Sequence, residues 1–216
     1  MGYLGSDALT VQLWVDKYNL KTLVETGLEH GRSMAWATTN LSGIEKFVAV
    51  EIDYKWIVSA GEIGLMHHDP APGAPERKML DDSINLIHGE SADKLPEAIE
   101  ISEGNILWWL DAHVPKKGAR FEKDKEATTA ELLHRDVAFP LERELGVIKA
   151  QRDISGDVFI IDDMRLYDKN GSKNWYVERG YDNPGTSEFI TSELEATHTI
   201  EKIHKDSIYL IALPKS

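Results

Sequence analysis

The chain has 216 residues and carries a net charge of −13 at pH 7, from 37 acidic and 24 basic side chains. This charge argues against a nucleic acid as the main partner, because binding a polyanion needs a basic surface. The absence of cysteine excludes a disulfide or a thiolate zinc site, and no apolar run approaches the roughly 20 residues of a membrane span. We therefore expect a soluble, cytoplasmic protein without a signal peptide, folded as one domain over residues 1–216. A homo-oligomer stays open.

Strand and helix signals then alternate along the chain. Residues 1–20 predict an N-terminal helix or arm, with Leu9, Leu13 and Trp14 on one face. Five short, continuous apolar runs are typical of strands covered on both faces, at 22–26, 47–52, 84–87, 106–110 and 158–161. Helices are predicted between them, at 32–41, 54–66, 92–101 and within 114–151, where Pro140 stands in the first turn of the last one. The proline-rich segment 69–75 predicts a loop.

The last part of the chain predicts a helix at 186–196 and two strands at 197–204 and 207–213, which a short link makes antiparallel. Repeated strand–helix–strand units form right-handed crossovers, so they predict a parallel sheet covered by helices. The closing hairpin would add an antiparallel edge strand. The predicted fold class is therefore α/β, with the adjacent Trp108 and Trp109 buried in the fourth strand.

An acidic residue stands at the end of each apolar run. These residues are Glu25, Glu51, Glu90, Asp111 and the pair Asp162–Asp163. In open parallel sheets, ligands bind outside the carboxyl ends of the strands. The row of carboxylates therefore predicts a binding site at that edge, for a ligand that suits negatively charged surroundings.

Two glycines, Gly27 and Gly31, separate the first strand from the following helix. Glycine allows a tight turn and a close approach of a ligand to the backbone, and the helix behind it offers free N–H groups; a plain turn that binds nothing is the alternative. A dinucleotide would need the pattern G-x-G-x-x-G, which is absent here, and Glu25 and Glu29 would repel its phosphates. A ligand with an ammonium, a sulfonium and ribose hydroxyls suits these acids better, and S-adenosylmethionine has all three.

Five short motifs carry a resemblance to a known family. They are V-E-T-G-x-x-x-G-x-S at 24–33, A-V-E-I-D at 49–53, H-G-E-S at 88–91, W-L-D-A-H at 109–113 and I-I-D-D at 160–163. In this order they resemble a class I S-adenosylmethionine-dependent methyltransferase, and most of all the macrocin-type O-methyltransferase branch. The resemblance covers about residues 20–165. It implies a Rossmann-like, seven-stranded, mostly parallel sheet with helices on both faces and an antiparallel edge strand near the C-terminus.

The resemblance also implies which residues bind the cofactor. They are Glu25, Gly27, Gly31, Ser33, Glu51, Glu90, Ser91 and Asp111. Glu51 would accept the ribose hydroxyls, since it ends a strand about twenty residues after the glycine turn. The turn at 89–91 would contact adenine; in the alternative, Ser91 and Asp93 only cap the next helix.

Three carboxylates, Asp111, Asp162 and Asp163, match the positions that hold an ion in the metal-dependent members of the family. They form a hard oxygen set suited to Mg²⁺, although an Asp-Asp pair after a strand is also a common turn pattern. Asp111 and His113 are the expected catalytic residues. His113 is open to three roles: a general base, a further metal ligand or an ordinary loop histidine.

We therefore expect an S-adenosylmethionine-dependent methyltransferase that acts on a hydroxyl of a small molecule such as a sugar, with assistance from a metal ion left open. Segments 114–140 and 167–184 would shape the acceptor pocket. A second hypothesis is an adenosyl- or nucleotide-binding module of the same fold without transfer activity. A third, a nicotinamide-dependent oxidoreductase, is disfavoured by the acids in the glycine turn.

Overall fold

The structure is a computed structural model that describes residues 4–5, 9–29, 31–53, 84–113, 138–167, 187–204 and 208–215. Its strands are β1 (Leu20–Thr26), β2 (Lys46–Glu51), β3 (Ile84–His88), β4 (Asn105–Leu110), β5 (Val158–Ile161), β6 (His198–His204) and β7 (Ile208–Pro214). Its helices are α1 (Val11–Tyr18), α2 (Arg32–Asn40), α4 (Ser91–Ile101), α7 (Leu141–Gln151) and α9 (Glu188–Leu194), with a short 3₁₀ turn, η2 (Met164–Leu166). None of these helices is long and apolar enough to cross a membrane.

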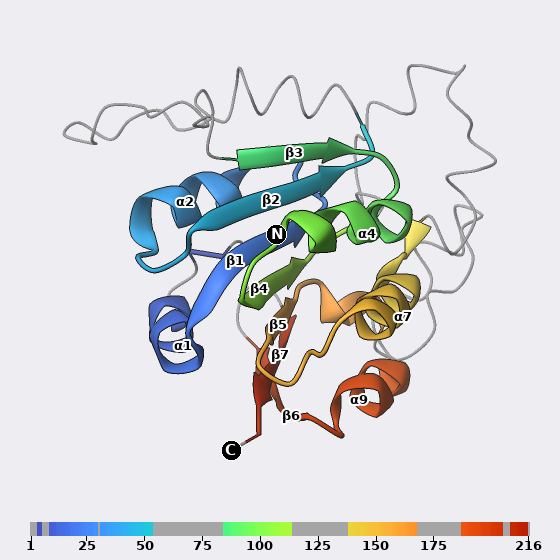
Figure 1. Cartoon of the computed structure of the whole chain (residues 1–216). Helices are drawn as coiled ribbons and strands as arrows, with labels where there is room; N and C mark the ends of the chain where they lie inside the picture. The colour runs from blue at the N-terminus through green and yellow to red at the C-terminus, as the bar shows by residue number, and fades with distance from the viewer. Residues whose placement is uncertain are drawn as a thin grey trace, which may run out of the picture.

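The strands form one sheet of seven in the order β3-β2-β1-β4-β5-β7-β6 (Figure 1). Strands β1 to β5 pair in parallel, and β7 runs antiparallel to both of its neighbours. This confirms the predicted α/β, Rossmann-like, mostly parallel sheet. One detail differs, because the antiparallel strand β7 lies inside the sheet and β6 forms the edge. The reason lies in the apolar content of the two strands: residues 209–212 of β7 are buried, whereas β6 carries the exposed Glu201.

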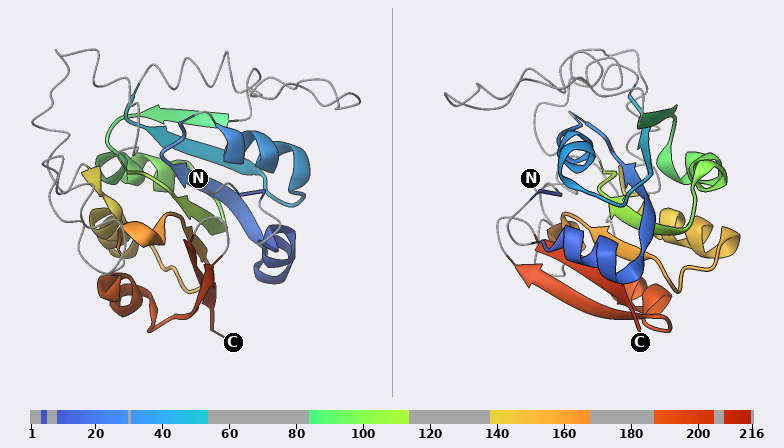
Figure 2. Two further views of the ribbon diagram at one scale, coloured as in Figure 1. Left: turned by 180° about the vertical axis from the view of Figure 1, so that it is seen from behind. Right: turned by 60° about the vertical axis from the view of Figure 1, so that its left-hand side comes forward.

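Helices cover both faces of the sheet, as Figure 2 shows most clearly in its right-hand view: α1 and α2 lie on one side, and α4, α7 and α9 on the other. Every residue from Ile106 to Leu110 is buried, because β4 lies at the centre of the sheet. Trp108 stacks on Phe159 on the α4 and α7 side, and Trp109 contacts Tyr209 on the other. The prediction that the two tryptophans belong to the core is confirmed.

The N-terminal helix was predicted with the wrong buried face. Helix α1 buries Val11, Trp14 and Val15, which are spaced three and four residues apart. Leu9 is buried just before the helix, but Leu13 is 64% exposed because it points away from that stripe. The error came from extending the apolar face across neighbouring positions, which in a helix point in different directions.

Helix α7 begins at Leu141, directly after Pro140, close to the predicted position. The predicted helix at 54–66 and the loop at 69–75 lie outside the described residues, as do segment 114–137 and most of 167–184.

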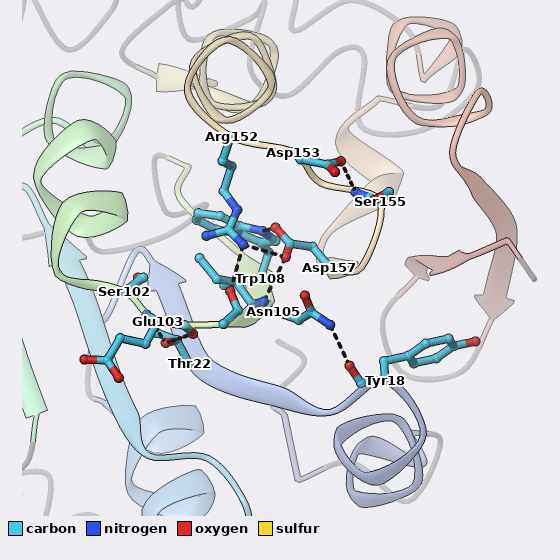
Figure 3. Close-up of polar contacts among 12 residues, drawn as sticks. Tyr18, Thr22, Ser102, Glu103, Asn105, Trp108, Arg152, Asp153, Ser155 and Asp157 are labelled. Carbon is cyan, nitrogen blue, oxygen red and sulfur yellow. Dashed lines mark hydrogen bonds and ion pairs between the residues drawn. The ribbon is translucent and has the colours of Figure 1, made fainter.

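At the amino end of the parallel strands, the buried carboxylate of Asp157 joins three elements (Figure 3). It accepts hydrogen bonds from the Ile106 N–H at 2.9 Å and from the Trp108 indole N–H at 2.9 Å, and pairs with Arg152 at 3.0 Å. The ring nitrogen Nε2 of His198 lies 2.9 Å from the Asp157 carbonyl oxygen. Burial raises the pKa of Asp157, and the charge of Arg152 offsets part of this effect. The network fixes β4, β5 and the end of α7 relative to each other.

We expect Asp157→Ala to destabilise the protein by about 3–5 kcal/mol, because it removes the ion-pair partner of the half-buried Arg152 and the acceptor of two buried N–H groups. Urea unfolding followed by tryptophan fluorescence measures the loss. Asp153→Ala is the matched control, since Asp153 is an exposed carboxylate in the same loop that accepts the Ser155 N–H (Figure 3). A loss as large in the control as in Asp157→Ala would contradict this account.

Candidate functional site

The carboxyl ends of β1, β2, β4 and β5 bring the predicted acids into one electrostatic group. The charges of Asp111 and Glu51 raise the pKa of Glu25, and those of Asp111 and Asp163 raise the pKa of Asp162, in both cases after the larger effect of burial. Carboxylates close enough to raise one another's pKa repel one another when ionised. The edge of the sheet therefore attracts cations.

Glu25 lies on the face of the sheet that α1 and α2 cover, in register with Trp109. It is 2% exposed, and burial raises its pKa well above the usual value. Its oxygen Oε2 has no hydrogen-bond partner within the described part of the chain. Buried acceptors in native proteins rarely stay without a donor, so this oxygen indicates a ligand or a water molecule that donates to it.

The turn at Gly27 packs closely against the backbone of the segment that follows β4. Gly27 has a φ of +79°, and a Cβ atom there would lie 2.8 Å from the Cα atom of Ala112. Only glycine therefore lets the segment after β4 pass this close to the turn. Gly31, at a φ of +65°, precedes the first residue of α2, and the hydroxyl of Ser33 accepts the Leu4 N–H at 3.1 Å.

Glu51 ends β2 and is 6% exposed. Its two oxygens accept the N–H groups of Glu29 at 3.0 Å and Asp53 at 2.9 Å. Burial raises the pKa of Glu51, although these two hydrogen bonds lower it in part. Each carboxylate oxygen has a second lone pair, so Glu51 can still accept a pair of hydroxyl groups.

Glu90 is the residue that caps α4. Its carboxylate accepts the N–H groups of Ala92 at 3.2 Å and Asp93 at 3.3 Å, and it pairs with Arg143 of α7 at 3.0 Å. The alternative in which Ser91 or Asp93 caps this helix is therefore wrong. Ser91 is instead a buried first residue of α4. The sequence could not show the ion pair, because Arg143 lies 53 residues further along the chain.

His113 lies between two carboxylates. Its Nε2 is 3.1 Å from Oδ2 of Asp163, and its Nδ1 is 3.4 Å from Oδ1 of Asp111 and 2.9 Å from the Asp111 carbonyl oxygen. Burial alone would lower the pKa of His113, but the hydrogen bonds and charges of the two aspartates raise it to about 10. The ring is then an imidazolium and a proton donor. The general-base role expected for His113 would need another cation to neutralise these aspartates.

The donor atoms of Asp111, His113 and Asp163 lie within 4.8 Å of one another, which is the spacing of ligands around one metal ion. Asp162, the third carboxylate of the predicted set, accepts the Asp163 N–H at 2.6 Å with its Oδ1. Burial, followed by the charges of Asp111 and Asp163, raises the pKa of Asp162 to about 7. Asp163 has a φ of +50°, an unusual conformation that turns the chain sharply after β5.

Sequence reasoning missed a further acid, Glu144, in the first turn of α7. It is 1% exposed, and neither of its oxygens makes a hydrogen bond of good geometry within the described residues. Burial raises its pKa to about 7, although the nearby hydroxyls of Ser91 and Thr26 lower it in part. The spacing of Glu144 in the sequence could have indicated that it is buried, because it shares the apolar face of α7 with Leu141 and Ile148.

Glu144 also lines a recess below the ends of β4 and β5, which has room for about one water molecule. The other lining residues are Leu110, Asp111, Ala112, His113, Leu141, Ile161, Asp162, Leu166 and Tyr167. The recess thus joins Glu144 to the acids at the strand ends.

Neither a protein-family model nor a curated protein matches this sequence. Several solved structures are similar to this chain. The O-methyltransferase TomG from Streptomyces achromogenes, crystallised with S-adenosylmethionine, is 15% identical over 95% of this chain and 78% of its own, with a TM-score of 0.52. A Staphylococcus aureus protein assigned as a caffeoyl-CoA O-methyltransferase is 13% identical over 94% and 80%, with a TM-score of 0.55.

The chain has the fold of the S-adenosylmethionine-dependent O-methyltransferases. A spermidine synthase from Thermotoga maritima is also similar, at 12% identity over 97% of this chain and 58% of that one, with a TM-score of 0.52. Identities this low show the fold alone. In addition, the names of the three proteins describe more than one kind of reaction. The activity of this chain must therefore be argued from its own residues.

Glu144→Gln should stabilise the ligand-free protein at high pH. A buried carboxyl with a raised pKa stabilises the fold below its unfolded pKa, and this contribution is lost as the pH rises through about 7. The free energy of unfolding of Glu144→Gln should therefore exceed that of the parent by an amount that grows between about pH 5 and about pH 8, by up to about 3 kcal/mol. Urea unfolding at both pH values measures it.

Glu100→Gln, an exposed acid near the end of α4, is the control. It should alter stability by the same small amount at both pH values. An equal effect of Glu144→Gln at both pH values would contradict the account.

Proposed function

We propose that this protein is an S-adenosylmethionine-dependent methyltransferase that methylates a hydroxyl group of a small molecule such as a sugar, as in the macrocin-type branch. The observation that carries the proposal is the buried oxygen of Glu25 at a strand end, beside Glu51 and Asp111, which has no hydrogen-bond partner among the residues that the structure describes. Three converging acids suit a ligand that combines an ammonium, a sulfonium and ribose hydroxyls. Phosphate-bearing dinucleotides would be repelled.

Each part of the cofactor has a matching group in the chain. Glu25 would accept a hydrogen bond from the ammonium, and Glu51 would accept the two ribose hydroxyls. The N-terminus of α2, behind Gly31, offers backbone N–H groups to the carboxylate. When bound, the cofactor supplies a methyl group on a sulfonium sulfur.

Asp111 and His113 would face the methyl acceptor. The transfer is a direct displacement, so these residues must hold the acceptor oxygen in line with the methyl–sulfur bond, and this positioning supplies much of the acceleration. The carboxylate of Asp111 can take the proton that the hydroxyl loses. The imidazolium of His113 can donate a hydrogen bond that orients the same oxygen.

The donor set also fits a divalent cation. Two carboxylates and one imidazole, from Asp111, Asp163 and His113, suit Mg²⁺, Mn²⁺ or a similar ion. When bound, the ion would lower the pKa of an acceptor hydroxyl. His113 would then lose its proton and become a ligand, because the ion replaces it as the cation between the two aspartates.

The adenosyl-binding module without transfer activity remains the second candidate. One observation favours it: the ring of His113 already pairs with both Asp111 and Asp163, the groups that would serve the acceptor. Transfer of labelled methyl groups from S-adenosylmethionine to a panel of hydroxylated small molecules separates the two. Transfer that Asp111→Ala abolishes supports the enzyme, and binding without transfer to any of them supports the module.

S-adenosylhomocysteine should bind the full chain with heat that calorimetry detects. Glu25→Gln should weaken this binding about 10-fold or more, because a hydrogen bond to a charged carboxylate is lost. Glu100→Gln, an exposed acid at the far end of α4, should leave the affinity unchanged. A folded parent protein that gives no heat at high ligand concentration would overturn the cofactor assignment.

Mn²⁺ should bind the full chain and be detected by its electron paramagnetic resonance signal. Asp163→Asn should weaken this binding about 10-fold or more, since one of the two charged ligands is lost. Asp153→Asn, outside the cluster, should bind Mn²⁺ as the parent does. Equal binding by all three proteins would remove the metal from the proposal.

A further inference from the structure

The carboxyl group of Glu144 is buried and lacks a well-formed hydrogen bond among the described residues. It is 1% exposed, and both of its oxygens lack a hydrogen bond of good geometry within the described residues. The hydroxyls of Ser91 and Thr26 lie close enough to lower its pKa, although neither reaches it with good hydrogen-bond geometry. Leaving such groups unpaired costs about 1–3 kcal/mol each, so native structures fill these places with a water molecule or a ligand.

The two acids near the start of α4 differ in this respect. Glu90 already has partners within the chain, because its oxygens accept two N–H groups of α4 and pair with Arg143. Glu144 lies near Ser91 and Thr26 and has neither a cation nor an N–H donor on it among the described residues. Of the two, Glu144 has more lone pairs free to accept hydrogen bonds from a ligand.

The proposed cofactor position, on which this inference rests, leaves one part of the cofactor for Glu144. Glu25 and Glu51 follow Leu23 and Ala49 by two residues, so they lie on the sheet face that α2 covers. The ammonium and the ribose would occupy that side. The base would then extend over the strand ends to the other face, where Thr26, Ser91 and Glu144 lie.

The recess beside Glu144 matches a single small donor. It has room for about one water molecule, and Glu144, Asp111 and Ala112 are among the residues that line it. A purine ring does not fit inside, but the exocyclic amino group of adenine is one nitrogen with two hydrogens. That group can enter the recess while the ring stays above it.

We propose that Glu144 recognises the adenine base of the cofactor by accepting a hydrogen bond from its exocyclic amino group. Glu144 would then be a specificity-determining residue, supplied by α7 across the sheet from the glycine turn. Its carboxylate lies on the other face of the sheet from Glu25 and Glu51, and the recess that it lines is shared with Asp111 and His113. A water molecule alone in the recess is the competing occupant.

The test compares two ligands that differ in this amino group only. Calorimetry measures the binding of S-adenosylhomocysteine, and of its 6-deamino analogue with hydrogen in place of the amino group, to the full chain. The parent protein should bind the first about 10-fold or more tightly than the second, as a hydrogen bond to a carboxylate is worth. Glu144→Met, which keeps the size of the side chain but removes the acceptor, should reduce this ratio to within about threefold.

Glu100→Gln is the control, and it should keep the ratio of the parent. If the parent binds both ligands within about threefold, the recess holds water only and the inference is wrong, whether or not Glu144→Met folds. If Glu144→Met discriminates as well as the parent, another group reads the amino group and the inference is also wrong. If neither ligand binds the folded parent, the proposed function itself fails.

Discussion

Crowding of carboxyl groups at one end of the sheet is the constraint that governs this structure. Glu25, Glu51, Asp111, Asp162 and Glu144 are all held with raised pKa values, mainly because burial removes the water that would stabilise their charges. Their mutual repulsion adds to this effect. Such an arrangement is stable only if some of these groups keep a proton or a cation lies among them. His113 supplies one such cation from within the chain, between Asp111 and Asp163.

The two ends of the sheet show the difference between a structural and a binding arrangement. At the amino end, Asp157 is buried but fully engaged by Arg152, Trp108 and the backbone of Ile106. At the carboxyl end, buried oxygens of Glu25 and Glu144 lack such partners among the described residues. Both ends place carboxylates in the core, so burial alone does not identify a site. Buried carboxylate oxygens without a donor do distinguish the carboxyl end, whereas the unpaired buried atoms elsewhere in the described residues include N–H groups of Arg152 and Trp109.

Much of this could be predicted from the sequence, because continuous apolar runs specify strands buried on both faces, and parallel strands must end at one edge. Trp108 and Glu51 were placed correctly on that basis. The order of the last two strands, the exposure of Leu13 and the pairing of Glu90 with Arg143 could not be obtained in this way. Each depends on which residues meet across the fold, and local pattern does not encode that.

Glu144 illustrates the limit most clearly. An acid on the apolar face of a helix looks like an error in the hydrophobic pattern, and only the packing of α7 against α4 shows that it points toward the strand ends. In the folded structure, the position of this acid suits the binding of a ligand. A helix that needed only to cover the sheet would place an apolar side chain there, since burying a carboxyl without a partner is costly. The hydroxyls of Ser91 and Thr26 lie near this carboxyl, and a donor from outside the chain would complete its hydrogen bonding.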